Sequence, residues 1–226
     1  MNRNPECKLC PLHEQCKTVC IPTVRYESLA PTGAPQIRTP QRDTAILILG
    51  EAPGALEDTA GEPFVGPSGH MLKKSYIEYF GLQNLADIYL GNAVRCRPPR
   101  NDTPKKSQIS ACRFYLIEDL FSLQESYKKV IILACGAVPA QACGFRSLKQ
   151  ALSNQGKVME FEGHGSKVPV FATFHPAYLM RSPSATLQVE AHLLSFRAHL
   201  TGEKTYQVEA DNLQLDLASP VPEDIG

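Results

Sequence analysis

Ala45-Ile46-Leu47-Ile48-Leu49, an uninterrupted apolar run, decides the fold predicted for this chain. A short run of this kind is typical of a strand that is buried on both faces of a sheet. Similar runs follow at 88–94 and 130–135. Strands buried on both faces are found in parallel sheets, because the crossover connections lay helices over each face.

Helical patterns separate these runs. Apolar residues recur at helical spacing in 72–80 and in 109–123, and 186–200 predicts a helix that closes the domain. The segments 158–161 and 168–174 are two further strand candidates. The alternation of strands and helices predicts an α/β fold with a parallel sheet covered on both faces.

The composition excludes several classes of protein. Of the 226 residues, 43% are hydrophobic and 20% are charged, which is typical of neither a disordered tail nor a membrane protein. The longest apolar run, 130–138, is too short to cross a bilayer, and residues 1–10 contain no hydrophobic signal segment. We therefore expect a cytoplasmic, monomeric protein with no membrane partner.

Four segments are expected along the chain. Residues 1–20 form a Cys-rich knuckle, and residues 21–43, with four prolines, form an extended connector. Residues 44–201 hold the α/β domain, and residues 202–226 form an acidic, flexible tail. The net charge of zero hides a basic stretch, 92–113, which has six Arg or Lys residues and one acid.

The loops after the predicted strands carry the residues that are best suited to binding or catalysis. In a parallel sheet, ligands bind beyond the carboxyl ends of the strands. Glu51 follows the first strand, Asn92 ends the second, and His175 follows the last. Phe64 and Glu57 lie in the long loop after the first strand.

Together these side chains suit a nucleobase that has been turned out of a DNA stack. The face of Phe64 can replace the lost stacking, and the amide of Asn92 can pair with a pyrimidine edge. Cleavage of the bond from sugar to base builds negative charge on the base, which a donor on His175 would stabilise. A carboxylate near the sugar can stabilise the cation or orient a water molecule.

Eight cysteines are many for a chain of this length. In a reducing compartment they favour metal or cluster ligation over disulfides. Cys135 and Cys143 suit buried core positions. The other six lie in the N-terminal knuckle and around the basic stretch: Cys7, Cys10, Cys16, Cys20, Cys96 and Cys112.

Several long motifs make the chain resemble the iron-sulfur-containing uracil-DNA glycosylases, known as family 4. The motifs are Cys7-x2-Cys10, ILGEAPGALED at 48–58, GEPFVGPSG at 61–69, GNAVRCRPPRNDTP at 91–104 and FHPAYLMRSP at 174–183. The resemblance implies excision of uracil from DNA. It also implies a three-layer α/β/α sandwich with a central, mainly parallel sheet of about four strands.

The resemblance also assigns roles around the base. It implies that Phe64 stacks on uracil, that Asn92 reads its edge, and that His175 faces the leaving base. Glu51, with the backbone of Ala52 and Pro53, lines the pocket. Better-known glycosylases have an Asp where this chain has Ala52, so the water-orienting residue differs here. Glu51 is the first candidate for that role and Glu57 the second.

A 4Fe-4S cluster is the cofactor that the resemblance implies. Its four ligands are Cys7, Cys10, Cys96 and Cys112, and its role is structural. Zinc is the alternative, because four thiolates also form a closed tetrahedral site. Cys16 and Cys20 depart from the family pattern, and Cys7, Cys10, Cys16 and Cys20 are a possible local quartet. The connector is also longer than is usual in the family.

Two macromolecular contacts are expected. Arg95, Arg97, Arg100 and Arg181 would hold the phosphates of uracil-containing DNA. The tail sequence Gln214-Leu215-Asp216-Leu217 resembles the peptide that bacterial replication enzymes insert into the sliding clamp. Two alternatives to the enzyme remain, a cluster-stabilised nucleic-acid-binding module without turnover and a zinc-held interaction protein.

Overall fold

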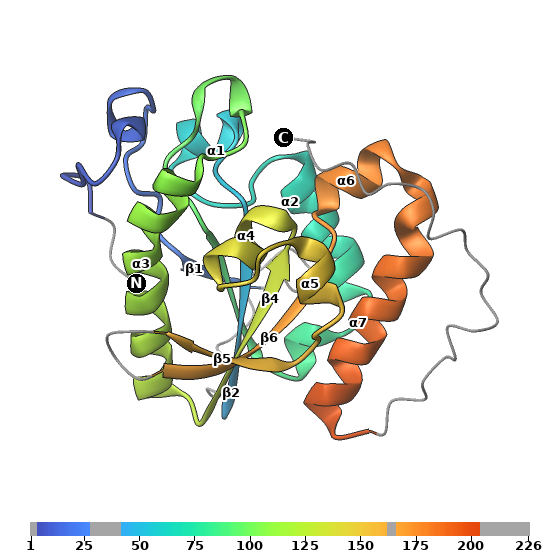
Figure 1. Cartoon of the computed structure of the whole chain (residues 1–226). Helices are drawn as coiled ribbons and strands as arrows, with labels where there is room; N and C mark the ends of the chain where they lie inside the picture. The colour runs from blue at the N-terminus through green and yellow to red at the C-terminus, as the bar shows by residue number, and fades with distance from the viewer. Residues whose placement is uncertain (1–3, 28–41, 162–165, 204–226) are drawn as a thin grey trace.

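A six-stranded sheet forms the centre of the part of the chain that is described, residues 4–27, 42–161 and 166–203 of the computed structural model (Figure 1). The strand order is β1-β3-β2-β4-β6-β5. The strands are β1 (Val24–Arg25), β2 (Thr44–Gly50), β3 (Asp87–Asn92), β4 (Lys129–Cys135), β5 (Lys157–Phe161) and β6 (Ser166–Thr173).

The four inner strands are parallel, and the two edge strands are antiparallel to their neighbours. The predicted mainly parallel sheet is therefore confirmed, with six strands where about four were expected. The difference includes β1, which lies in the predicted connector. This two-residue strand pairs Val24 with Leu90 and Arg25 with Tyr89, and so short a segment has no period of its own for sequence reasoning to detect.

One face of the sheet is covered by α3 (Lys106–Ser126), α4 (Ala137–Ala142) and α5 (Leu148–Leu152). Alternate strand residues such as Leu47, Ile132 and Val170 pack against these helices. The core on this face includes Leu116 and Leu120 of α3, as the spacing in 109–123 predicts.

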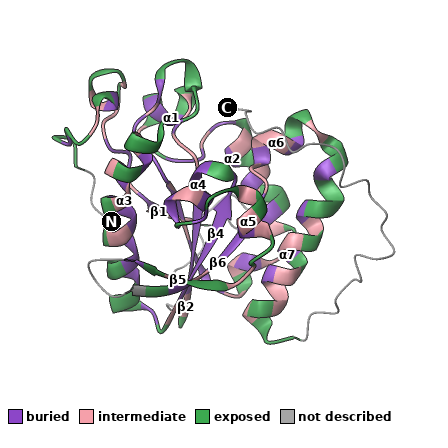
Figure 2. Ribbon diagram, in the orientation of Figure 1, coloured by how far each residue is buried: buried purple, intermediate pink, exposed green. Residues whose placement is uncertain are grey.

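The opposite face is covered by η2 (Leu72–Glu78), α6 (Pro176–Arg181) and α7 (Thr186–Thr201). Ile48 and Leu133, which alternate with the residues of the first face, pack here. Figure 1 shows α3 and α7 on opposite sides of the sheet, and Figure 2 shows the inner strands buried between them. The predicted three-layer α/β/α sandwich is confirmed.

The segment 72–80 is helical as predicted, but it takes the wider π form in η2. The N–H of Tyr79 donates to the carbonyl of Lys74, five residues earlier, at 3.0 Å. The remaining short helices are η1 (Pro11–Glu14), α1 (Ala55–Ala60), α2 (Pro67–Met71), η3 (Leu82–Asn84), η4 (Pro99–Asn101) and η5 (Pro183–Ala185).

Some predictions lie outside the described residues. These are most of the connector, at 28–41, and the tail from 204 onward, which contains Gln214-Leu215-Asp216-Leu217. Over the described ranges, no helix has the length and apolar character that a bilayer span requires.

Candidate active site

The carboxyl ends of the parallel strands bring the predicted site residues to one edge of the sheet. Gly50 at the end of β2 is in register with Asn92 at the end of β3. On the other side of β2, the N–H of Gly136, just beyond β4, donates to the carbonyl of Thr173 at the end of β6 at 2.9 Å. Glu51, Asn92 and His175 therefore emerge from the same edge.

Phe64 and Asn92 converge above Gly50. A Cβ atom added to Gly50 would lie 2.5 Å from Cζ of Phe64 and 2.6 Å from Oδ1 of Asn92. The aromatic ring and the amide therefore occupy the space that a side chain at this position would fill. This geometry fits the expectation that the ring of Phe64 and the amide of Asn92 face one site.

The backbone at Phe64 has an unusual conformation that its neighbours stabilise. Its φ is 57°, in the left-handed region that bulky residues rarely adopt, and only 4% of its surface is exposed. A Cβ at Gly69 would lie 2.1 Å from the carbonyl oxygen of Phe64, so α2 can approach this backbone only because residue 69 is glycine. The ring is thus fixed by both burial and close backbone packing.

Glu57 supports the loop that carries Phe64. Its carboxylate accepts hydrogen bonds from the N–H groups of Gly54 at 3.1 Å and Gly66 at 2.7 Å, and the residue is buried. Both oxygens are therefore engaged with backbone at the two ends of the loop. This arrangement fits a positioning residue better than the water-orienting role for which Glu57 was the second candidate.

Glu51 is the carboxylate with greater freedom. Within the described ranges, its side chain accepts no hydrogen bond and forms no ion pair. Burial raises the pKa of Glu51, and the positive charge of Arg181 opposes that shift. Arg181, on α6, is exposed. Ala52 is half-buried and Pro53 buried beside Glu51.

His175 is held as a neutral imidazole. Its Nδ1 accepts a hydrogen bond from the N–H of Ala177 at 3.2 Å, which caps α6 and leaves the ring proton on Nε2. Burial lowers the pKa of His175 to about 4, Arg181 lowers it further, and Glu57 opposes the shift. The preceding residue is anchored because the hydroxyl of Tyr76 donates to the carbonyl of Phe174 at 3.0 Å. His175 can therefore act as an Nε2–H donor at neutral pH.

Six cysteines from three separate parts of the chain come together beside this site. The N–H of Cys20 donates to Sγ of Cys96 at 3.3 Å, and the thiol of Cys16 is a hydrogen-bond partner of Cys96. Cys112 lies within electrostatic reach of Cys7, Cys10 and Cys20. The fold therefore brings Cys96 and Cys112 to the knuckle and does not leave them isolated from it.

The donor set is one that both a thiolate-bound iron-sulfur cluster and a closed zinc site use. All six cysteines are free thiols. Across the described ranges, no three Cys, His, Asp or Glu side chains are close enough together to hold a single metal ion. Four sulfurs around zinc would be about 4 Å apart at Zn–S bonds of about 2.3 Å.

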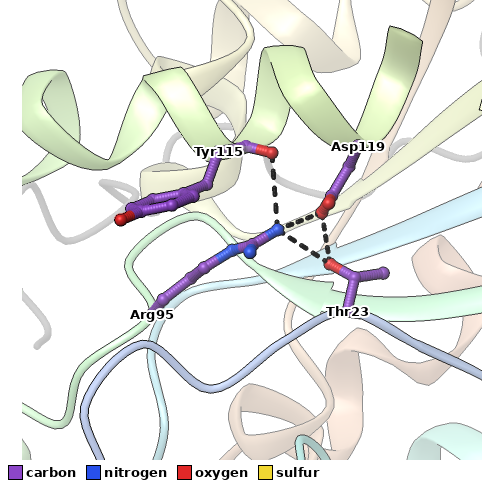
Figure 3. A network of polar contacts seen from close by, with 4 residues as sticks. All are labelled: Thr23, Arg95, Tyr115 and Asp119. Atoms are coloured by element: carbon purple, nitrogen blue, oxygen red, sulfur yellow. Dashed lines mark hydrogen bonds and ion pairs between the residues drawn. The ribbon is translucent and has the colours of Figure 1, made fainter. Parts of the chain in front are cut away.

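Arg95 does not reach the surface, which corrects the expectation that it contacts DNA phosphate. It is 2% exposed, and its guanidinium forms an ion pair with buried Asp119 of α3 (Figure 3). The same guanidinium donates to Thr23 Oγ1 and to the carbonyl of Tyr115, both at 3.4 Å, and lies over the Tyr115 ring. The hydroxyl of Thr23 also donates to Asp119.

The Arg95–Asp119–Thr23 network joins the three segments that carry the cysteines. Arg95 precedes Cys96, Thr23 follows Cys20, and Asp119 lies two helical turns after Cys112 on α3. The N–H of Ile21 adds a hydrogen bond to the carbonyl of Arg95 at 2.8 Å. Arg95 is therefore a structural residue of the cysteine group.

Arg97 and Arg100 remain available at the surface. Nε of Arg97 donates to Oδ1 of Asn101 at 2.7 Å, and the Arg100 side chain, 84% exposed, pairs with Asp102 at 3.0 Å. Both lie in the loop between β3 and α3, at the same edge of the sheet as Asn92. Their position fits the expected contact with a polyanion.

The match to a family model decides the classification. The model described as the uracil DNA glycosylase superfamily matches residues 38–201. The chain belongs to the uracil-DNA glycosylase superfamily. Several type-4 uracil-DNA glycosylases are similar to it, among them the proteins of three organisms. The Pyrobaculum aerophilum protein is 32% identical over 84% of this chain and 87% of its own length. The Archaeoglobus fulgidus protein is 32% identical (82% and 83%), and the Thermotoga maritima protein is 34% identical (65% and 71%).

Sequence reasoning missed two acidic residues of this superfamily member that the structure shows to be important. Asp58, next to Glu57, accepts hydrogen bonds from the N–H groups of Lys17 and Thr18 and so attaches the knuckle to α1. Asp119 is the partner of Arg95. A signal for Asp119 was present, because it is an acid within the apolar stripe of 109–123, and buried carboxylates are normally paired.

Proposed function

We propose that this chain excises uracil from DNA by hydrolysing the N-glycosidic bond, which starts base excision repair and leaves an abasic site. The observation that carries the proposal is the convergence of Phe64 and Asn92 above Gly50. An everted pyrimidine would stack on the ring, while the amide would pair with its acceptor and adjacent N–H. Membership of the uracil-DNA glycosylase superfamily supports the same reaction.

His175 would stabilise the leaving base. In the reaction, the electron pair of the bond between C1′ and N1 leaves with uracil, a water oxygen bonds to C1′, and the proton that this water loses passes to solvent, from which the uracil anion is protonated. The Nε2–H of neutral His175 would donate to the uracil oxygen as negative charge develops there. Because the imidazole of His175 is neutral, it stabilises the charge on uracil by donating a hydrogen bond, and it does not have to transfer its proton.

Glu51 is the residue we assign to the sugar side of the reaction. Its carboxylate has no hydrogen-bond partner within the described ranges, whereas both oxygens of Glu57 hold backbone N–H groups. As a carboxylate, Glu51 would stabilise positive charge on the ribose or orient the attacking water. Arg97, Arg100 and Arg181 would hold backbone phosphates around the everted nucleotide.

A 4Fe-4S cluster on Cys7, Cys10, Cys96 and Cys112 is the cofactor we propose. When bound, the cluster would supply cross-linking and no chemistry at the base, fixing the knuckle to α3 and to the loop with Arg97 and Arg100. Cys16 and Cys20 lie in the same group. Iron content and visible absorbance of anaerobically purified Cys→Ser variants would identify the ligands. Loss of iron in Cys16→Ser and Cys20→Ser, with retention in Cys96→Ser and Cys112→Ser, would contradict this ligand set.

The test of the activity uses oligonucleotides with one uracil, either paired or unpaired. We expect free uracil and an alkali-labile abasic site from the wild type, with thymine and hypoxanthine as control bases. Asn92→Ala and His175→Ala should each lower kcat/KM by roughly 100-fold or more. His70→Ala, which removes an exposed histidine on α2, is the matched control. DNA binding without base release would contradict the proposal and favour a binding module.

The clamp-binding peptide stays a separate proposal. Gln214-Leu215-Asp216-Leu217 lies outside the described residues, so its support is the sequence alone. A pull-down with purified sliding clamp should retain the full chain and lose a chain that ends before Gln214. Equal retention of both chains would exclude this contact.

A further inference from the structure

A basic hollow of about 510 Å³ lies on the α3/α4 side of the sheet, apart from the candidate active site. Three cationic side chains line it, together with two neutral polar side chains and an aromatic ring. In that order these are Lys106, Arg113, Arg146, Ser110, Gln141 and Phe145. No acidic residue is part of the lining. The hollow therefore concentrates positive charge in a chain whose net charge is zero.

The three cations of the hollow are not neutralised by the protein. Within the described ranges, Lys106, Arg113 and Arg146 form no ion pair with a carboxylate. In contrast, Arg25, Arg95 and Arg100 each have an acidic partner. Like charges that face one hollow repel one another, so an anion between them would relieve that repulsion.

Arg113 supplies a second and independent observation. Its Nε is buried and has no hydrogen-bond partner, one of two such side-chain atoms among the described residues. Its guanidinium carbon lies 5.7 Å from the centroid of the Phe161 ring, which supports the side chain from one side. A buried donor without an acceptor is costly, and the residue that carries this donor lines the hollow.

The hollow lies close to the path that DNA would take. The helix α4 begins next to Gly136, where an added Cβ would lie 3.4 Å from Cβ of His175, and it ends at the hollow. Six helical residues span about 9 Å. Successive nucleotides of one strand rise by about 3.4 Å, so the hollow lies within a few nucleotides of His175.

The other wall of the hollow continues the basic surface of the loop after β3. Lys106, at the start of α3, follows this loop, which holds Arg97 and Arg100. Figure 1 shows α4 beside the upper part of α3, in front of the sheet. A strand that passes Arg97 and Arg100 would therefore meet Lys106 next.

We propose that this hollow binds one backbone phosphate of the DNA substrate, a few nucleotides from the everted base. The proposal rests on the proposed glycosylase function for its ligand. The phosphate oxygens would accept hydrogen bonds from Arg113 and Arg146, and Lys106 would add charge at the rim. Apolar walls such as Phe145 reduce the solvation of the site and strengthen these contacts.

The test is the salt dependence of binding to a uracil-containing duplex. Lys106→Gln and Arg146→Gln change exposed side chains, so both variants should fold. We expect each variant to raise the Kd for DNA roughly three- to tenfold. Each should also reduce the magnitude of the negative slope of log K against log salt concentration by about 0.9. Lys128→Gln is the matched control, because it removes an exposed charge just before β4, at the opposite edge of the sheet.

A second measurement locates the phosphate on the DNA. Oligonucleotides shortened stepwise from each end should lose affinity for the wild type at one step, when the phosphate that reaches the hollow is removed. Arg146→Gln should not show that step. Arg113→Gln, with its folding checked by thermal melting, should behave like Arg146→Gln.

The outcomes distinguish this proposal from the proposed activity. If the wild type releases uracil but the hollow variants bind with the wild-type Kd and salt slope, the hollow assignment is wrong and the glycosylase stands. If no uracil is released, the glycosylase is wrong, while a reduced salt slope of DNA binding would still support the hollow. Inorganic phosphate alone could also raise the melting temperature of the wild type while the variants bind DNA as the wild type does. That result would make the hollow a free-phosphate site and overturn the proposal.

Discussion

The ring of Phe64 and the side-chain oxygen of Asn92 both lie against the position that a side chain of Gly50 would occupy. The three residues come from one loop and the ends of two neighbouring strands, β2 and β3. The ring and the amide can take these places because residue 50 has no side chain. The width of the proposed base site thus depends on a glycine that itself offers no side-chain group to a ligand.

Gly50→Ala should close the base site. The added methyl would lie 2.5 Å from the ring of Phe64 and 2.6 Å from the amide of Asn92, so at least one of them must move. We expect kcat/KM to fall roughly 100-fold, since displacement by about 1 Å has effects of that size. The unfolding free energy should fall by about 1–3 kcal/mol. Thr44→Ala, at the other end of β2, is the control, and full activity of Gly50→Ala would contradict this geometry.

Glu51→Gln and Glu57→Gln should separate chemistry from positioning. Glu57→Gln replaces an oxygen that accepts a backbone N–H with an NH2 group, so we expect it to lower the unfolding free energy by about 1–3 kcal/mol and to raise KM. Glu51→Gln should lower kcat with little change in thermal stability. If Glu57→Gln instead has the melting temperature of the wild type and a lowered kcat, Glu57 would be the residue that acts in the chemistry.

Asp119→Ala should destabilise the protein by about 3–5 kcal/mol, because it leaves the guanidinium of Arg95 buried and unpaired. The double variant Arg95→Met/Asp119→Leu should recover much of this stability, since apolar residues can replace a buried ion pair. Its DNA affinity at several salt concentrations is the decisive measurement. A wild-type salt slope is expected, and a slope lowered by about 0.9 would restore Arg95 as a phosphate contact.

Arg97→Gln and Arg100→Gln should behave in the opposite way to the Arg95 variant. Both side chains lie in the loop between β3 and α3, and Arg100 is paired with exposed Asp102. Each substitution should leave the unfolding free energy within about 0.5 kcal/mol of wild type. Each should lower the salt slope of DNA binding by about 0.9. Asp102→Asn, which frees Arg100, should bind DNA more tightly than the wild type, and weaker binding would argue against this contact.

The pH dependence should show that His175 is neutral. Because its pKa is lowered to about 4, the activity profile should have no break near the usual histidine pKa of about 6.5. Protonation at lower pH would place a hydrogen on Nδ1 opposite the N–H of Ala177 and disrupt the cap of α6. Protonation of Glu51, whose pKa is raised, should also lower the activity at acid pH. The pH profile of Glu51→Gln would show how much of that loss is due to His175 alone.

The unfolding free energy should also depend on pH through the protonation of His175. Between about pH 4 and 6.5 the unfolded chain binds more protons at His175 than the folded chain does, so the unfolding free energy falls as the pH decreases through this window. The loss is at most about 3 kcal/mol. His192, whose pKa burial also lowers to about 4, acts in the same direction. Denaturant unfolding of His175→Asn should show a shallower pH dependence, and an unchanged one would contradict the burial of this imidazole.

The inner strands and the strand-end residues could be predicted because they depend on local pattern. Runs such as 45–49 are apolar throughout, and the strand-end rule then places Glu51, Asn92 and His175 at one edge. Arg95 was predicted wrongly because its partner, Asp119, lies 24 residues away. No local pattern distinguishes an arginine that meets phosphate from one that meets a distant buried acid.

The loop of Phe64 shows a second limit of sequence reasoning. The residue could be nominated for stacking, but its φ of 57° and its dependence on Gly69 follow from the approach of α2 to its backbone. Likewise, Glu57 and Asp58 look equivalent in the sequence. One carboxylate binds the loop of the base site and the other binds the knuckle, because they leave the short helix α1 in different directions.

Tyr26 and Arg42, on either side of residues 28–41, are both held at one place on β3. The N–H of Tyr26 donates to the carbonyl of Ile88 at 2.8 Å, and the N–H of Arg42 donates to the carboxylate of the adjacent residue, Asp87, at 3.4 Å. When both ends of a loop are fixed at neighbouring points, each doubling of its length costs only about 0.6 kcal/mol. An affinity tag, a fluorophore or new chain termini introduced between these two anchors should therefore leave base capture intact.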